Sequence, residues 1–155
     1  MDLHKSTLLL FILFVVISAQ SNLFLGAGGV GFGCGSNSPA TQRPFSYVRL
    51  GPDTTPIVKK LYFEPHHFGG YSTMDHAIRA ISHMHLVGAG VADLGILGIL
   101  PLKSKKIKIP HDPLVVLYKS TEYAEPGYYN ATLQNNINIE LTSTQRAGVH
   151  RYKFN

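Results

Sequence analysis

The stretch that decides the fold is Tyr128-Tyr-Asn-Ala-Thr-Leu-Gln-Asn-Asn-Ile-Asn-Ile-Glu-Leu141. Apolar and polar side chains alternate over residues 128–133 and again over 137–141. This two-residue period is typical of half-buried strands. Asn135-Asn136, between the two runs, is typical of a turn. The stretch therefore predicts two consecutive strands with one face in the core.

Similar short runs, rich in β-branched and aromatic residues, continue outward from this pair. They predict strands at residues 45–50, 57–63, 107–109, 114–118 and 149–154, with turns at 51–56, 111–113 and 125–127. Only residues 75–86 show a loose helical spacing, and an irregular strand suits them equally well. The fold class expected from these runs is all-β, an antiparallel β-sandwich.

The first 19 residues read as a targeting segment. Lys5 precedes an uninterrupted apolar run over residues 7–17, and Ser18-Ala19 follows it. This run of roughly 13 residues is shorter than the ~20 that a membrane span needs. We predict a signal peptide at 1–19, a domain at 20–155, a secreted or lysosomal location and no membrane span after cleavage, with an uncleaved anchor as the alternative. Export would make Asn130-Ala-Thr132 an N-glycosylation acceptor.

Composition narrows the functional class. With 155 residues, 45% of them hydrophobic, the chain can bury one modest core. Most of the excess behind the net charge of +5 lies in residues 103–108, which read as a solvated strand or loop. The chain has no Trp and no basic run interleaved with aromatics, so nucleic acid is not an expected partner. The single cysteine, Cys34, is read as a buried thiol rather than half of an intermolecular disulfide.

A polar site is expected around residues 80–101, where His83, His85 and Asp93 lie among closely spaced glycines. On an extended segment, histidines at i and i+2 project from one face and could line a pocket. The simpler alternative to a pocket is that His83 and His85 are ordinary core or surface residues. Zinc is another, but its third ligand would have to come from His66, His67, Asp75, His111 or His150.

The glycine-rich opening over residues 26–31 matches the dinucleotide pattern G-x-G-x-x-G. That fingerprint needs a helix directly after the loop, whereas glycines, Pro39 and Pro44 follow here. We interpret it as a loop that uses positive φ angles and lies against a domain or a ligand. No carboxylates form an evident pair and no serine sits in a nucleophile elbow, so the residues predict a binding surface or a partial active site without catalytic residues.

Three motifs in register resemble the N-terminal domain of glycoside hydrolase family 92, the exo-acting α-mannosidases. They are the block from Gly26 to Thr54, the block from Gly69 through Ile81-Ser-His-Met-His-Leu-Val-Gly-Ala-Gly-Val-Ala-Asp-Leu-Gly95 to Pro101, and Glu125-Pro-Gly-Tyr-Tyr129 with residues 139–142 and 150–152. The resemblance covers nearly all of the chain after the signal peptide.

The resemblance implies a β-sandwich of the supersandwich kind, incomplete at Asn155, that packs against a C-terminal (α/α)6 barrel, with the active site between them. It implies removal of terminal mannose from N-glycans with inversion, a pair of acids, and calcium whose ligands lie mainly on the barrel. The partners implied are a mannose-containing glycan and the barrel that this chain lacks. The fragment alone is expected to be inactive, and a non-catalytic secreted carbohydrate- or protein-binding sandwich is the alternative.

The resemblance implies a substrate-binding wall and no catalytic or metal-ligating residue on this chain. The residues carried over to the wall are Phe32, Gly33, Arg49, Asp53, His83, His85 and Asp93. The chain departs from the family pattern at Ser46-Tyr47, Ile81, Met84, Leu94 and Lys119-Ser-Thr121.

Overall fold

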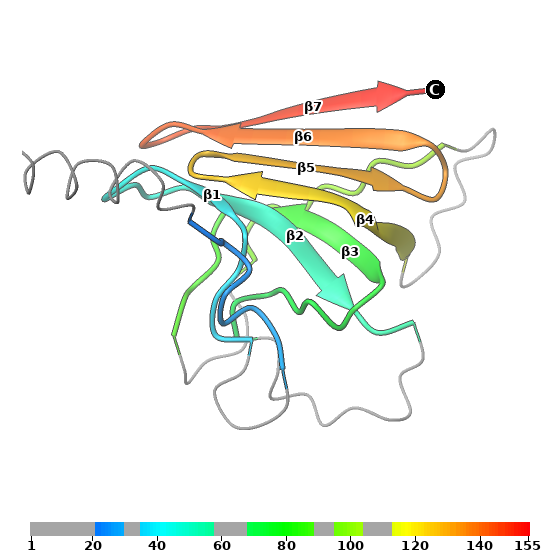
Figure 1. Cartoon of the computed structure of the whole chain (residues 1–155). Helices are drawn as coiled ribbons and strands as arrows, with labels where there is room; N and C mark the ends of the chain where they lie inside the picture. Colours follow the sequence, from blue (N-terminus) through cyan, green and yellow to red (C-terminus); the bar gives the residue numbers. More distant parts are fainter. Residues whose placement is uncertain (1–20, 30–34, 58–67, 89–94, 104–112) are drawn as a thin grey trace, which may run out of the picture.

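The computed structural model describes residues 21–29, 35–57, 68–88, 95–103 and 113–155 (Figure 1). These residues form seven strands and no helix, which confirms the all-β fold class. The strands are β1 (Thr41–Gln42), β2 (Arg49–Thr55), β3 (Ala77–Ser82), β4 (Val115–Glu125), β5 (Tyr128–Leu133), β6 (Ile137–Ser143) and β7 (Gly148–Phe154). Residues 75–86, where helical spacing was considered, contain β3 instead. The predicted signal peptide, the strand at 107–109 and nearly all of the strand at 57–63 lie outside the described residues.

The strands follow one another in a single antiparallel sheet, in the order β1 to β7. Each pair of neighbours from β4 to β7 is joined by five to seven residue pairs. β3 and β4, in contrast, are joined only by Ala77↔Val116 and Ile78↔Val115. The sheet bends at this narrow junction, so that β1 to β3 lie across one side of the layer made by β4 to β7 (Figure 1). As a result, β1 and β2 contact β6 although neither pairs with it. The two layers form the sandwich.

The core lies between the layers and follows from the alternation of side chains. Every second residue of β5 and β6 is buried, and the register sets Tyr129 opposite Leu141 and Ala131 opposite Ile139. Leu50 and Ile81, from β2 and β3, belong to the same fully buried cluster. Burial of apolar surface between the layers is the main stabilising term, at about 25 cal/mol per Å².

The outward face of β5 and β6 is polar, as the same alternation requires. Asn130, the predicted glycosylation acceptor, lies within β5 on this face. Its Nδ2 donates to Asn138 Oδ1 at 3.2 Å and to Ile139 O at 3.0 Å. Attachment of a glycan remains a prediction, and it would require these bonds to open.

Residues 51–56, which were predicted to form a turn, belong mostly to β2, and this prediction was wrong. Pairing between β1 and β2 ends at Leu50, so Pro52 lies where no neighbour on that side needs its missing N–H. A register shift between Asp53 and Thr54 follows directly. The strand predicted at 45–50 is likewise displaced, because regular pairing begins only at Arg49. The turns at 125–127 and 135–136 are as predicted.

A surface ion network ties β6 to β7 and is expected to make stability depend on acid pH. Two hydrogen bonds, the stronger from Arg151 and the weaker from Lys153, lower the pKa of Glu140 to about 2. A lowered carboxyl pKa stabilises the fold above the ordinary value of 4.5, and this stabilisation disappears as pH falls through about 2. Thermal unfolding should therefore show the Glu140→Gln variant melting below the wild type at pH 6, with the gap closing near pH 2. A gap that persists at pH 2 would contradict this assignment.

Candidate functional site

Three polar side chains from β2 and from the end of β3 converge at one place. Ser82 Oγ donates to Asp53 Oδ1 at 2.9 Å, and His85 Nε2 lies 2.9 Å from Ser82 Oγ and 3.2 Å from Asp53 Oδ1. The antiparallel register, which sets Gly51 opposite Ser82, brings the two strands together here. We call Asp53, Ser82 and His85 the Asp53 cluster.

The partners of His85 determine which ring nitrogen carries hydrogen. Its Nε2 lies 3.3 Å from the carbonyl oxygen of Gly51 as well as close to the Asp53 carboxylate, and both of these groups only accept. Nε2 is therefore protonated and donates, while the Ser82 hydroxyl donates its own hydrogen to Asp53. The imidazole is 2% exposed and the Asp53 side chain 18% exposed, so the carboxylate is the part of this pair that solvent reaches.

Glycine backbone from two other segments lies directly against the Asp53 cluster. A Cβ on Gly70, whose φ is +76°, would lie 2.3 Å from His85 Nδ1, and one on Gly95 would lie 2.8 Å from Ser82 Oγ. Both positions therefore need a residue without a side chain, because backbone must approach the polar groups closely. This packing limits access to the cluster from these two sides.

The early glycine-rich segment reaches the same region through its backbone. Gly69 N donates to Gly35 O, and Gly88 N donates to Ser36 O, both at 2.8 Å. Gly26, Gly29 and Gly35 all have positive φ, as the sequence interpretation required. The described parts of this loop thus lie beside the segments that carry Gly70 and His85. Phe32, Gly33, Cys34 and Asp93 lie outside the described residues.

Arg49 starts β2, four residues before Asp53 and on the same face of the strand. Burial lowers the pKa of its guanidinium. Its Nε is buried and has no hydrogen-bond partner among the described residues. Arg49 is therefore a partly desolvated donor on the same strand as Asp53, and a polar ligand could satisfy it.

His83 is directed away from His85, so the two rings do not share one site. Its Nε2 lies 3.0 Å from His150 Nε2, and its Nδ1 lies 3.2 Å from Leu97 O. β3 ends at Ser82, so the alternation that would place residues 83 and 85 on one face no longer holds. Over the described ranges, no three His, Cys, Asp or Glu side chains gather as a metal site. His66, His67 and His111 lie outside those ranges.

A buried carboxylate that was not among the residues predicted from the sequence, Glu122, stabilises the loop next to the site. Glu122 accepts from Tyr129 OH at 2.6 Å and from Tyr71 OH at 2.9 Å, and it pairs with Lys119 Nζ at 3.0 Å. Burial, followed by the charge of Glu122, raises the pKa of both phenols, whereas burial lowers the pKa of Lys119. Because Tyr71 follows Gly70, this network holds in place the loop that covers His85.

The register shift in β4 explains why Glu122 was missed. Pairing with β5 is interrupted between Tyr118 and Tyr123, where Thr121 Oγ1 donates to Tyr118 O and accepts from Thr132 N. This irregularity turns Glu122 inward. Alternation counted forward from the buried Leu117 places Glu122 outward, so the pattern before the shift does not predict its position.

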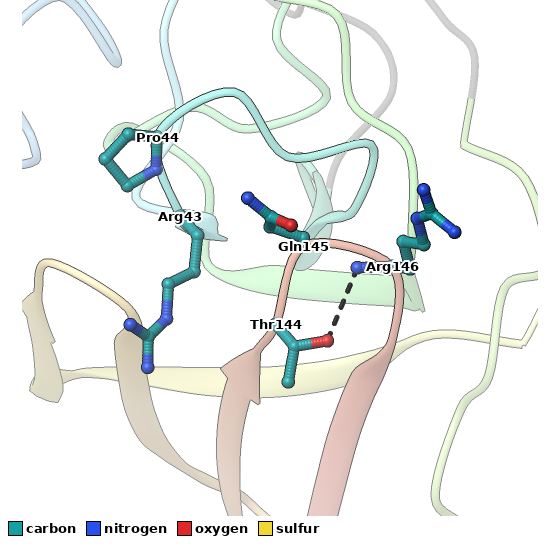
Figure 2. A pocket seen from close by; sticks show the side chains of 5 residues that line it. All are labelled: Arg43, Pro44, Thr144, Gln145 and Arg146. Carbon is teal, nitrogen blue, oxygen red and sulfur yellow. Dashed lines mark hydrogen bonds between the residues drawn. The ribbon is translucent and has the colours of Figure 1, made fainter.

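An open hollow of about 590 Å³ lies between the β1–β2 loop and the β6–β7 hairpin (Figure 2). Its walls are Arg43, Pro44, Thr144, Gln145 and Arg146. The two arginine side chains point in different directions, so they do not converge on a single ligand group (Figure 2). None of these residues belongs to the Asp53 cluster.

Comparisons with known proteins place this chain in a family. A GH92 α-mannosidase from Bacteroides thetaiotaomicron matches with 26% identity and a TM-score of 0.64 over 86% of this chain and 18% of that one. Its complex with mannoimidazole matches with 27% identity and a TM-score of 0.65 over 86% and 17%. The GH92 glycosyl hydrolase ccman5 shares the fold, with 21% identity, a TM-score of 0.60 and coverage of 86% and 18%.

The chain thus spans less than a fifth of the length of these structures. No curated protein matched it. Within the described ranges, no helix is long and apolar enough to cross a membrane. The model of the glycosyl hydrolase family 92 N-terminal domain matches residues 22–155. This chain belongs to glycosyl hydrolase family 92, as its N-terminal domain.

Proposed function

We propose that this chain supplies one wall of the mannoside site in an α-mannosidase-like glycoside hydrolase of the secretory pathway. The substrate proposed is terminal mannose on N-glycans. The observation that carries the proposal is the Asp53 cluster, whose carboxylate is partly open to solvent and whose imidazole is oriented by Ser82. The exposed part of the Asp53 carboxylate is suited to accepting hydrogen bonds from the adjacent hydroxyls of a sugar, and Ser82 and the buried His85 hold it in place.

Two further observations support a sugar over a less polar ligand. Arg49, on the same face of β2, offers a buried donor that lacks a partner among the described residues. The GH92 α-mannosidase that shares 27% identity with this chain was solved with mannoimidazole. A mannoside would satisfy the Arg49 donor and use the acceptors of Asp53.

The chemical step is proposed to reside outside this chain. Inversion needs two carboxyl groups roughly 6.5–9.5 Å apart across a water. Asp53 is held by Ser82 and His85, Asp75 accepts from Thr54 Oγ1 at 2.7 Å, and Glu122 is held by two phenols and a lysine. Each of these carboxylates is therefore engaged by side chains of this fold, which supports placing the acid and the base outside this chain. No three His, Cys, Asp or Glu side chains gather among the described residues, and we propose that the calcium ligands lie mainly outside this chain.

The proposal is tested by titrating the full chain with methyl α-mannoside while following histidine and backbone resonances by NMR. We expect weak, saturable shifts centred on Asp53, Ser82 and His85. The Asp53→Asn variant keeps the shape of the side chain but loses its charge, so affinity should fall about tenfold or more, the effect of a hydrogen bond to a charged group.

Glu125→Gln, which changes an exposed carboxylate at the β4–β5 turn, is the matched control and should bind like the wild type. Methyl β-galactoside should bind more weakly, because its hydroxyls point in other directions. Equal shifts with both sugars, or mannoside shifts that are unchanged in Asp53→Asn, would overturn the proposal.

A further inference from the structure

A hydrogen-bonded series of three polar side chains joins the segment after β3 to the edge strand β7. Tyr152 OH lies 2.7 Å from His150 Nδ1, and His150 Nε2 lies 3.0 Å from His83 Nε2. His83 Nδ1 in turn lies 3.2 Å from the carbonyl oxygen of Leu97. Backbone packs closely here, because a Cβ on Gly148 would lie 2.8 Å from His83 Cδ2. The contact therefore fastens one layer of the sandwich to the other.

The donor and the acceptor of every hydrogen bond in this series follow from its last acceptor, the carbonyl oxygen of Leu97. A carbonyl oxygen cannot donate, so His83 Nδ1 carries hydrogen and, in the neutral ring, His83 Nε2 accepts. His150 must then donate from Nε2, which leaves its Nδ1 to accept from the Tyr152 hydroxyl. With both rings neutral, each donor meets an acceptor.

The hydrogen-bonded series Tyr152–His150–His83 can hold one additional proton but not two. If His83 becomes cationic, its Nε2 donates to His150, whose hydrogen moves to Nδ1 and points at the Tyr152 oxygen. Every contact survives this change. If His150 is protonated as well, two N–H groups on two cations face each other at the 3.0 Å contact. Like charges at that distance repel, and no acceptor remains between them.

We propose that His83, His150 and Tyr152 form an acid-released latch, which holds residues 83–88 against β7 until both imidazoles are protonated. Release would free the backbone that the latch fixes. Arg49 N donates to His83 O at 2.9 Å, and His83 N donates to Ile96 O at 3.1 Å. The latch concerns the fold of this chain and does not depend on the proposed function.

The surroundings of the latch contain few other charges. On β6, the residues opposite His150 and Tyr152 are Leu141 and Ile139, and β2 contributes Leu50 beside Gly148. Glu140, Arg151 and Lys153 pair with one another on the opposite face of the same strands. Among the described residues, the ionisable groups in contact with the His150 ring are His83 and Tyr152, and Arg49 lies next to His83 through its backbone N–H.

The direction of titration agrees with the geometry. Burial, followed by the charge of His83, lowers the pKa of His150 below its ordinary 6.5, and burial raises the pKa of Tyr152 to about 12. The phenol thus remains a donor throughout the relevant range. Because the folded state binds the second proton less readily than the unfolded chain, the latch is stable above pH 6.5 and weakens as pH falls below it.

Amide hydrogen exchange on the full chain between pH 7 and pH 5 tests the latch. After correction for intrinsic rates, protection of the Arg49 and His83 amides should fall about tenfold or more, the equivalent of one pKa unit of coupling. In His150→Gln the second titrating ring is gone, so protection should stay level across this range. His76→Gln, which removes an exposed histidine elsewhere, should behave like the wild type.

A fall of equal size in His150→Gln, or no fall in the wild type, would overturn the proposal. His83→Gln serves as the second variant if His150→Gln does not fold. Imidazole NMR of His150 in the wild type tests the latch without any variant, because burial and the neighbouring His83 should keep the pKa of His150 below 6.5. A His150 pKa at or above 6.5 would rule out the latch.

Discussion

Glu122→Ala should lower the free energy of unfolding by about 3–5 kcal/mol, the usual effect of removing one partner from a buried ion pair. The Glu122 side chain is 5% exposed and that of Lys119 is 19% exposed, so water cannot readily replace the lost carboxylate. Tyr71 and Tyr129 would also lose their acceptor. Urea unfolding, followed by circular dichroism, measures the change.

Glu125→Gln is the control for this experiment, because Glu125 accepts only an exposed hydrogen bond from Tyr123. Its effect should stay within about 0.5 kcal/mol, as for most surface substitutions. A loss below about 1 kcal/mol for Glu122→Ala, the size of one ordinary hydrogen bond, would mean that the network is solvated and does not hold the Gly70 loop.

Gly70→Ala should be the most disruptive small substitution at the candidate site. A non-glycine residue in the left-handed region costs about 1–2 kcal/mol, and overpacking adds about 1–3, so we expect a loss of about 2–5 kcal/mol. The added Cβ would lie 2.3 Å from His85 Nδ1, which forces either the imidazole or the loop to move. Thermal unfolding gives the loss, and the His85 ring resonances report the displacement.

Gly127→Ala separates the two causes. Gly127 has a φ of +83°, but no atom of the described residues lies within 4 Å of an added Cβ, so only the conformational part of about 1–2 kcal/mol applies. If Gly70→Ala destabilises the fold no more than Gly127→Ala and leaves the His85 resonances in place, backbone does not pack against the imidazole as described.

Local patterns predicted the strands of the second half of the chain well, and those of the first half less well. β5 and β6 alternate cleanly because one face meets the core and the other meets solvent. β2 does not, because Pro52 and Asp53 are ordinary turn residues that are here accommodated at an unpaired edge and a register shift. Only the neighbouring strands decide which of these two environments applies.

The candidate site shows the same division. Asp53 and His85 were named from residue type and motif, and the structure brings them together through Ser82. His83 was named for the same reasons, yet its ring faces β7. Two residues of spacing define one face only while the strand continues, and β3 ends at Ser82.

By itself, the sequence determined the all-β class, the hairpins after residue 114 and the family, because side-chain alternation, turn residues and linear motifs are local properties. The bend between β3 and β4, the inward Glu122 and the separate environments of the two histidines were decided only by tertiary structure. Each of these depends on which strand, far along the chain, supplies the facing groups. Long-range packing, and not local preference, selects that partner.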